Sequence, residues 1–450
     1  MRVNRTHVIN ASSRSDASRP QTILAFILLP SLPMTKDFFT LDDFDLAGKT
    51  VLLRVDINSP INPATGELLN DARLREHMVT IRDLHRSRVA ILAHQSRPGK
   101  DDFTTMEQHA IRLSQLLGRQ VRYVDGLFNN TALEAIRGLA EGEIILLENT
   151  RFYAEEDALA DAKIEKMAKS HMVKRLSSVA KYFVLDAFAA AHRAQPSLVG
   201  FADIMPVIAG RVMEKELVMV GRALTSAERP KIVILGGIKA DDSIAVAKNM
   251  LSGDVVDKVL TTGGVANMFL AAKGIDLGKP SVELLRKEIE EYDDYVKQCK
   301  ELLLTHKSRI LMPTDVAVNA GGSRKNLQVT ELPSPHLISD IGLDTIVAYR
   351  QEIAAAKNII VNGPAGVFEE EEFALGTREL FNAVAESEAF SVVGGGHTVA
   401  AVDQFGIGDR IDHVSTGGGA LLTMLAGKEM PLVEALKRSK KKFGGGQHKS

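Results

Sequence analysis

The chain lacks many of the residues and segments that mark common protein classes. It has one cysteine and no tryptophan in 450 residues, and aromatic residues make up 5% of it. The lone Cys299 excludes an intrachain disulfide bond, which suits a reducing compartment, so we expect a cytoplasmic protein. The apolar run Ile23–Leu29 is too short to span a bilayer and no other run is long enough, so no membrane partner is expected.

The charges almost balance, at 55 basic against 57 acidic residues and a net charge of -2. This balance argues against general nucleic-acid binding, so each basic cluster must be interpreted at its own site. The hydrophobic content of 45% is ordinary for a globular protein, although 450 residues are too many for one ordinary core. We therefore expect more than one domain. We also expect the protein to be a monomer.

Several catalytic motifs are also missing. There is no H-E-x-x-H and no cysteine pair, so no metal site of the chain's own is predicted. There is no G-x-S-x-G elbow for a serine nucleophile. Neither a complete G-x-x-x-x-G-K-[ST] nor a strand-linked G-x-G-x-x-G occurs, because Gly48-Lys49-Thr50 lacks the earlier glycine. Chemistry by positioning and charge neutralisation is the better hypothesis, and phosphoryl transfer is a reaction of that kind.

Apolar segments of strand length alternate with amphipathic helical segments in the first half. Such strands, separated by helices, predict a parallel sheet covered on both faces. The expected strands are Thr50–Ile57, Arg88–Ala93, Glu143–Glu148 and Tyr182–Ala187. The expected helices are Arg73–Arg86, Met106–Leu117 and Asp157–Ala180.

A second series of the same kind follows Pro230. Its expected strands are Lys231–Leu235, Lys258–Thr261, Arg309–Pro313, Asn358–Val361 and Phe390–Val393. Its expected helices are Ser243–Leu251, Val265–Ala272, Ser281–Thr305, Thr345–Ala356 and Glu372–Glu386. The predicted fold class is α/β, with two doubly wound parallel-sheet (Rossmann-like) domains joined by the amphipathic inter-domain helix Arg211–Leu224. The ligand crevice of each domain should lie at the carboxyl ends of its strands.

The predicted boundaries divide the chain into five parts. Residues 1–33 differ in composition from the rest; they are either a targeting segment or an extension upstream of the true start at Met34, and we favour the extension. Residues 34–208 form the first domain, 209–225 the hinge helix and 226–430 the second domain. Residues 431–450 form a C-terminal segment whose basic tail, Lys437–Ser450, we expect to be solvated.

Basic and polar residues follow the strands of the first half. Arg54, Asp56 and Asn58 end the first strand, and the next helix opens with Arg73. Further along, His94–Arg97, Arg151 and Arg193 follow later strands. If the strands are parallel, these side chains converge on one crevice. Arginine pairs with phosphate or carboxylate through two parallel bonds, so the expected ligand is a small, multiply charged anion. Asp56 would bind its hydroxyl groups or orient an arginine, although a structural role is equally open.

The second half has glycine-rich turns after its strands instead. Ser391–Thr398 (S-V-V-G-G-G-H-T) ends an apolar strand in three glycines and leads into a helix, which predicts a phosphate site at unpaired N–H groups. Gly236–Lys239, Thr262–Gly264 and Asn362–Gly366 have the same form. Turns of this kind also occur as plain structure. Their repetition in one half favours a nucleotide-like ligand, with Lys239 as its prominent cation.

Together these motifs resemble the phosphoglycerate kinase family, from about Phe39 to about Lys437. The resemblance rests on motifs that occur in family order. They are R-V-D-I-N (Arg54–Asn58), H-Q-S-R-P from His94, L-L-E-N-T-R-F-Y (Leu146–Tyr153), D-A-F-A-A-A-H-R (Asp186–Arg193), M-E-K-E-L (Met213–Leu217), G-G-I-K (Gly236–Lys239), N-G-P-A-G-V-F-E (Asn362–Glu369), G-G-G-H-T and S-T-G-G-G-A (Ser415–Ala420). Several are variants similar to those of the archaeal branch.

The resemblance implies a glycolytic and gluconeogenic phosphotransferase. Its reaction is the reversible transfer of a phosphoryl group between 1,3-bisphosphoglycerate and ADP, giving 3-phosphoglycerate and ATP, without a covalent intermediate. By this resemblance residues 34–208 bind the phosphoglycerate and residues 226–430 bind ADP or ATP with its Mg²⁺. The two domains must close on each other, since each substrate lies on its own half.

The resemblance also implies a role for each site residue. The phosphoglycerate-binding residues would be Asp56, Ile57, Asn58, Arg73, His94, Gln95, Ser96, Arg97, Arg151 and Arg193. The nucleotide-binding residues would be Lys239, Gly342, Asn362, Glu369, Gly395, Gly396, His397 and Thr398. Arg73 and Lys239 would be catalytic, flanking the transferring group, whose spread negative charge fixed cations stabilise.

Three positions depart from the family pattern. Ser243 stands where a second lysine is common, His397 where an aspartate is common near the nucleotide metal, and Gln195 where a second histidine is frequent. No nucleotide role is carried over to Ser243, and direct metal contact by His397 is not expected. These losses keep open an alternative, a non-catalytic pseudo-kinase module of the same fold. The retained arginines and Lys239 favour the enzyme.

Overall fold

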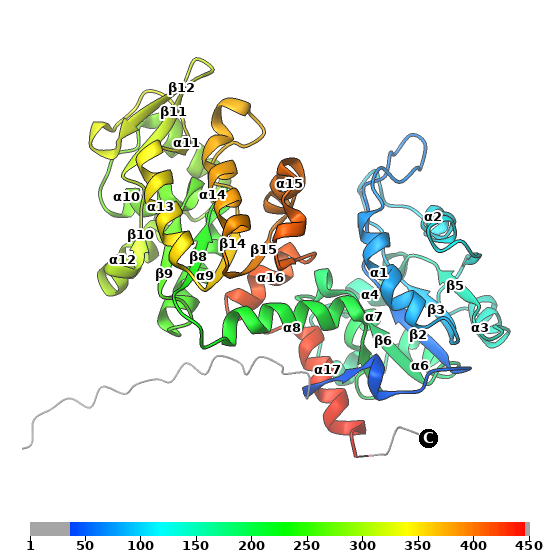
Figure 1. Cartoon of the computed structure of the whole chain (residues 1–450). Coiled ribbons are helices and arrows are strands. Elements are labelled where there is room, and N and C mark those ends of the chain that lie inside the picture. Colours follow the sequence, from blue (N-terminus) through cyan, green and yellow to red (C-terminus); the bar gives the residue numbers. More distant parts are fainter. Residues whose placement is uncertain (1–36, 446–450) are drawn as a thin grey trace, which may run out of the picture.

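The computed structural model describes residues 37–445. The predictions for residues 1–33 and for the last five residues of the basic tail lie outside that range. Within it, two separate parallel sheets with their helices flank one long helix, α8 (Arg211–Thr225), as Figure 1 shows. We call the sheet of residues 39–209 with its helices the N-lobe, and the later parallel sheet with its helices the C-lobe. The α/β fold class is confirmed.

The N-lobe sheet has seven parallel strands in the order β1-β7-β6-β2-β3-β5-β4. The strands are β1 (Phe39–Thr40), β2 (Thr50–Arg54), β3 (Arg88–Leu92), β4 (Val121–Val124), β5 (Ile144–Leu147), β6 (Tyr182–Leu185) and β7 (Val207–Ala209). The helices are α1 (Ala72–Asp83), α2 (Glu107–Leu117), α3 (Asn130–Arg137), α4 (Ala154–Ala158), α5 (Ile164–Met167), α6 (His171–Ser177) and α7 (Pro196–Val199). β1, β4, β7, α3 and α7 were not predicted.

The pairing register places the functional loops of the N-lobe at one edge. Arg54 at the end of β2 is opposite Leu92 of β3 and Leu185 of β6. The three strands therefore end together, and the segments that follow them share the carboxyl edge of the sheet. The central strands are apolar on both faces because helices cover both, which is why they appear in the sequence as continuous apolar runs.

The C-lobe sheet has six parallel strands in the order β10-β9-β8-β14-β15-β16. The strands are β8 (Lys231–Leu235), β9 (Lys258–Thr261), β10 (Ile310–Leu311), β14 (Asn358–Asn362), β15 (Phe390–Gly394) and β16 (His413–Val414). The helices are α9 (Ala240–Ser252), α10 (Gly263–Ala272), α11 (Lys279–Glu288), α12 (Tyr292–His306), α13 (Leu343–Ala355), α14 (Leu375–Glu386), α15 (Gly396–Phe405) and α16 (Gly418–Leu425). Asn362 is opposite both Leu235 and Gly394, so the glycine-rich turns also meet at one edge.

A three-stranded antiparallel sheet, which was not predicted, joins the C-lobe. It has the order β12-β11-β13, from β11 (Asp315–Ala320), β12 (Ser323–Gln328) and β13 (Ile338–Ile341). The turn between β11 and β12 contains Gly321 and Gly322, both at positive φ, at 68° and 91°. A glycine pair between two alternating segments is a hairpin signal, so a local pattern did mark this sheet.

Two long helices predicted from the sequence are wrong. Asp157–Ala180 is divided among α4, α5 and α6, because Asp161 adopts φ 59° and Ser170 caps the start of α6 through a bond from Val173 N–H. Ser281–Thr305 is divided into α11 and α12, because Ile289 is extended and turns into the core at 2% exposure. The predicted strand Arg309–Pro313 shortens to β10.

The end of the described chain is also more ordered than predicted. Helix α17 (Pro431–Phe443) includes much of the basic segment that was expected to be solvated. It returns to the N-lobe (Figure 1). There the Ser439 hydroxyl accepts a hydrogen bond of 2.7 Å from Val207 N–H, and Arg438 pairs with Asp203 at 2.7 Å. Both lobes share one continuous apolar cluster that runs through α8, while the opposite face of each sheet has its own cluster.

Candidate active site

Basic side chains gather at the carboxyl edge of the N-lobe sheet. We call this group the cationic edge after its four arginines; it consists of Arg73, Arg97, Arg151 and Arg193 together with His94, each from a segment that follows a strand. Burial lowers the pKa of Arg151, and the positive charges of Arg193 and Arg97 lower it further. Arginines that disfavour one another's charge in this way stabilise a bound anion. The predicted convergence of the arginines is thus present in the structure.

Asp56 is the acidic partner of this edge. It is buried, and its Oδ1 lies 2.9 Å from Nη1 of Arg73 while also accepting the Asn58 N–H at 3.3 Å. Burial raises the pKa of the Asp56 carboxyl, but the surrounding basic side chains outweigh burial and hold the pKa below its usual range. Asp56 therefore carries its charge and pairs with Arg73, while its role toward a ligand stays a prediction.

Asn58 and Ser96 connect the loops after β2 and β3. The Asn58 side-chain oxygen accepts a 2.7 Å bond from Ser96 N–H, and the Ser96 hydroxyl donates to Asp102 at 2.5 Å. Ser96 has φ 55°, a left-handed conformation that costs energy for a non-glycine residue. Its carbonyl also accepts a hydrogen bond from Arg151. The loops thus hold one another and the arginine in a fixed arrangement.

Ile57 and Gln95 lie beneath these loops, in the interior. Ile57 is fully buried in the apolar cluster of its lobe. The Gln95 side chain donates to the Ser59 carbonyl at 2.9 Å, accepts from Ser59 N–H at 3.1 Å and meets Nε2 of His109 at 3.1 Å. Their placement supports the loop framework, and any direct part in ligand binding stays a prediction.

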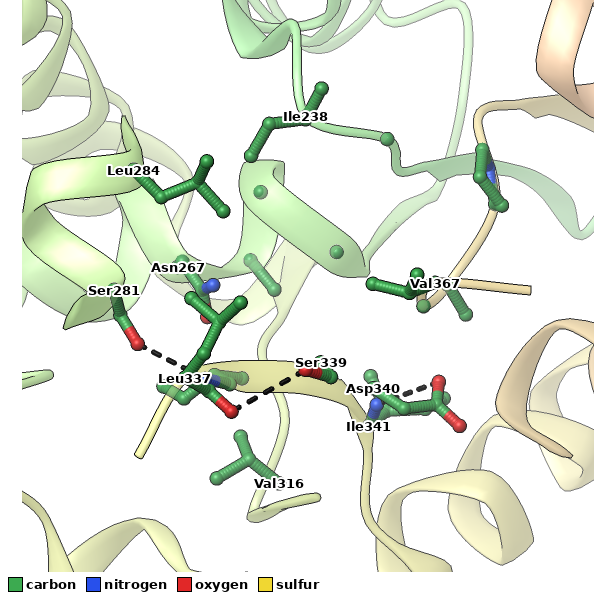
Figure 2. Close-up of a pocket in the computed structure, with 18 of the residues that line it drawn as sticks. Ile238, Asn267, Ser281, Leu284, Val316, Leu337, Ser339, Asp340, Ile341 and Val367 are labelled. Carbon is green, nitrogen blue, oxygen red and sulfur yellow. Dashed lines mark hydrogen bonds between the residues drawn. The ribbon is translucent and has the colours of Figure 1, made fainter. Parts of the chain in front are cut away.

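A cavity of about 190 Å³ opens at the carboxyl edge of the C-lobe sheet, between α10, α11 and the antiparallel sheet. Its walls are largely apolar, and Figure 2 shows Leu284, Val316, Leu337 and Val367 around it. Asn267 on α10 adds a buried amide side chain to this lining. An apolar slot with few polar groups is typical of a small-ligand site.

The glycine-rich turns meet beside this cavity, but their glycines serve different purposes. A Cβ on Gly236 would lie 2.3 Å from the Pro364 carbonyl, and one on Gly363 would lie 2.1 Å from the Gly236 carbonyl, so these turns pack on each other. Gly395 differs: at φ 100° it starts helix α15, and Gly396 and His397 that follow are exposed. The α15 start therefore offers the open N–H groups that a phosphate requires.

The other predicted nucleotide residues fall into two groups. Glu369 and His397 line the cavity, and Lys239 stands exposed at the start of α9 with no side-chain partner within the described chain. In contrast, the Asn362 amide bonds the Gly394 carbonyl at 3.0 Å, and the Thr398 hydroxyl accepts from Gly363 N–H at 2.7 Å. Gly342 packs on the Asp315 carboxylate. These last three residues hold the turns together.

Helix α8 connects the two edges through Glu216. This carboxylate is buried at 1% exposure and bonds Nε2 of His413 at 2.8 Å, the Ser415 hydroxyl at 2.9 Å and Thr416 N–H at 2.7 Å. All three partners belong to the C-lobe. The motifs M-E-K-E-L and S-T-G-G-G-A contain Glu216 and Ser415, but sequence reasoning missed their contact because the two residues lie about 200 positions apart.

Two further observations concern residues 37–445 only. No group of three or more histidine, cysteine, aspartate or glutamate side chains there is arranged to hold a metal ion. No helix in the same range combines the length and the apolar character needed to cross a membrane.

The geometry defines a class: a two-lobed α/β protein with a cationic edge on one lobe and a small-ligand cavity at the corresponding edge of the other. A family model described as phosphoglycerate kinase matches residues 41–428. A phosphoglycerate kinase of Thermoplasma volcanium is 51% identical over 407 residues, which cover 90% of this chain and 99% of the relative. One of Methanothermobacter thermautotrophicus is 49% identical and covers 91% and 99%.

Solved structures agree with this result. A phosphoglycerate kinase from Pyrococcus horikoshii OT3 has a TM-score of 0.82 at 46% identity, covering 90% of this chain and 100% of that one. One from Coxiella burnetii has a TM-score of 0.76 at 33% identity, covering 89% and 98%. The chain belongs to the phosphoglycerate kinase family. It is a glycolytic phosphotransferase, and none of these relatives favours the non-catalytic alternative.

Proposed function

We propose that the cationic edge binds 3-phosphoglycerate or 1,3-bisphosphoglycerate, that the C-lobe cavity and the α15 start bind ADP or ATP, and that the phosphoryl group passes between them. The observation that carries this proposal is the separation of two chemically different edges onto two lobes joined by α8. One edge suits a small anion, and the other suits a flat apolar group attached to phosphates.

On the N-lobe, Arg97, Arg151 and Arg193 would pair with the phosphate and carboxylate of the phosphoglycerate. Arginine's planar fork matches both groups. His94 would donate a hydrogen bond, and Asp56 and Asn58 would accept from the ligand's hydroxyl. Arg193 and Arg97 lower the pKa of Arg151, which supports this assignment, because a bound anion would offset the repulsion between these positive charges.

On the C-lobe, the apolar cavity would hold the base, and Glu369 at its rim would accept from the ribose. The phosphates would lie at Gly395, Gly396, His397 and Thr398, where the N–H groups and dipole of α15 favour negative charge. Mg²⁺ would enter as part of the nucleotide substrate, bound by phosphate oxygens. Asn362 and Gly342 would act through the turns that they hold.

The chemical step needs no protein nucleophile. A carboxylate oxygen of 3-phosphoglycerate attacks the γ-phosphorus of ATP, the bond to the β-bridging oxygen breaks, and ADP leaves. The reverse reaction forms ATP. Arg73 and Lys239, one from each lobe, would flank the transferring group and balance its spread charge once the lobes close. Closure would also exclude water, which would otherwise accept the phosphoryl group.

Two further expectations accompany the activity. We propose a cytoplasmic location, which the single, buried Cys299 supports. We also propose that the protein is a monomer, because the proposed activity needs no residue from a partner chain. Gel filtration with light scattering on the full chain would test the second.

The activity is tested with the purified full chain, 3-phosphoglycerate and MgATP, by reducing the product 1,3-bisphosphoglycerate with a coupled NADH-dependent dehydrogenase. We expect steady NADH loss that depends on both substrates. The matched control is the Arg73→Ala/Lys239→Ala variant purified in the same way, which should lose this activity and so reveals any host enzyme. Equal rates in the two preparations would contradict the proposal.

A further inference from the structure

His77 stands between the cationic edge and the hinge helix. It lies on α1, one turn after Arg73, and is buried at 2% exposure. Its Nδ1 is 2.8 Å from Oδ2 of Asp186, and its Nε2 is 3.2 Å from both the N and the O of Asp56. Both ring nitrogens therefore have hydrogen-bond partners, Nδ1 in Asp186 and Nε2 in the backbone of Asp56.

Asp186, the partner of His77, holds the start of helix α8. Its other oxygen, Oδ1, accepts from Val212 N–H at 2.9 Å and from Met213 N–H at 3.2 Å. These are first-turn N–H groups, which have no partner within the helix. The Arg211 N–H is bonded at 2.9 Å by the Thr80 hydroxyl, one turn after His77 on the same helix α1.

The next turn of α8 reaches the C-lobe. Glu216, one turn after Val212, binds the C-lobe residues His413, Ser415 and Thr416. A small cavity is lined by Arg73, His77, Val212 and Thr416, among others, so the two lobes meet beside His77. Contacts thus run without a gap from the Asp56–Arg73 pair through His77 and Asp186 into α8, and from α8 into the C-lobe.

We propose that His77 is a positioning residue that couples occupation of the phosphoglycerate site to movement of helix α8. It does not face the ligand and acts through Asp56 and Asp186. An imidazole suits this task because it is a rigid ring with a hydrogen-bonding nitrogen on each of two edges. When the Asp56 backbone shifts, the ring shifts with it and moves Asp186 and the start of α8. The inference rests on the proposed function, since it requires phosphoglycerate at the cationic edge.

Two substitutions test separately the hydrogen bond from His77 to Asp186 and the one from His77 to Asp56. The amide of Asn in His77→Asn can replace only Nδ1, toward Asp186, and that of Gln in His77→Gln can replace only Nε2, toward Asp56. We expect both variants to bind 3-phosphoglycerate within about threefold of the unmodified chain by calorimetry, yet to lose at least about tenfold in kcat. The matched control is His85→Gln, on an exposed histidine just beyond the end of α1, which should change neither.

A residue that only fills space would not give this division between binding and turnover. An unchanged kcat in both variants would overturn the proposal. The proposal would also be overturned if the affinity for 3-phosphoglycerate and kcat fell together while X-ray scattering showed normal compaction of the ternary complex. In that case His77 would only shape the binding site.

A measurement on the unmodified chain keeps the test open if the variants do not fold. Hydrogen exchange of the peptide that covers residues 211–217 is followed with and without saturating 3-phosphoglycerate. We expect slower exchange at the start of α8 when the ligand binds. If the ligand binds and turnover is normal but exchange is unchanged, the coupling is wrong; if the ligand does not bind, the proposed function itself fails.

Discussion

Nη2 of Arg54 lies 3.1 Å from Nδ1 of His94, in the interior beneath the cationic edge. Burial lowers the pKa of Arg54 to about 10, so the guanidinium is protonated at neutral pH and can only donate. Nδ1 of His94 must then accept, which leaves the ring proton on Nε2. Arg54 is itself held by the Ser197 hydroxyl at 3.2 Å, which bonds Glu156 at 2.5 Å.

The first prediction is that His94 stays neutral, with an unprotonated Nδ1, from pH 8 to pH 5.5. Burial, with help from Arg54, holds the pKa of His94 well below its usual range. Two-bond ¹H–¹⁵N spectra of histidine-labelled protein distinguish the two tautomers and the imidazolium. The signals are assigned with His94→Gln. A titration with a midpoint near the ordinary value of about 6.5 would refute the assignment.

The second prediction concerns stability in acid. Burial lowers the pKa of His109 to about 4, whereas the unfolded chain takes up this proton near pH 6.5. A lowered histidine pKa gives stability that is present above about pH 6.5 and is lost as pH falls. Between pH 7.5 and 4.5, His109→Gln should therefore lose about 2 to 3 kcal/mol less unfolding free energy than the unmodified chain. Equal losses in urea titrations would show that His109 is not the cause.

The third prediction is that Arg73→Ala lowers kcat by about a hundredfold or more while the affinity for ADP changes little. Arg73 is held by Asp56 at 2.9 Å and belongs to the N-lobe, whereas the cavity proposed for the nucleotide lies in the C-lobe. The matched control is Arg75→Ala on the same helix, where the arginine pairs with the outer Asp71 at 2.8 Å. Near-normal turnover of Arg73→Ala, or an equal loss in the control, would remove Arg73 from the chemical step.

The fourth prediction is that Glu216→Gln destabilises the protein by at least about 2 kcal/mol, because a buried carboxylate that accepts several hydrogen bonds is replaced by an amide that must also donate. Lys215→Gln, on the exposed face of the same turn, should change the unfolding free energy by less than about 0.5 kcal/mol. Chemical denaturation of both variants measures the difference. Similar small changes would mean that the Glu216 cluster does not tie the lobes.

Much of the fold could be predicted because parallel strands buried on both faces are continuous apolar segments. The rule that such strands end at one edge then placed Arg97, Arg151 and Arg193 together. The breaks at Asp161 and Ile289 escaped prediction because a left-handed residue and an inward-turned isoleucine leave the helical pattern around them almost unchanged. The docking of α17 depends on Ser439 and Val207, whose pairing is not local.

The glycines show the same limit at the candidate site. Their spacing predicted turns correctly, but it could not tell Gly363, which packs on another turn, from Gly395, which precedes the exposed start of helix α15. The sequence also could not show that the Gln95 side chain forms hydrogen bonds with the backbone of Ser59. The division into residues 34–208, 209–225 and 226–430 stays a prediction, and the return of α17 to the N-lobe argues against testing it with separated halves.

All of the proposed chemistry depends on each substrate binding its own lobe, and methyl NMR of the full chain can decide whether it does. Ile57 lies beneath the cationic edge, and Ile238 lines the C-lobe cavity (Figure 2), so their δ1-methyl signals report on the two sites separately. We expect 3-phosphoglycerate alone to shift the Ile57 signal and not that of Ile238, and MgADP alone to do the reverse. If both ligands shift the same methyl group and leave the other unchanged, the division of the substrates between the lobes is wrong.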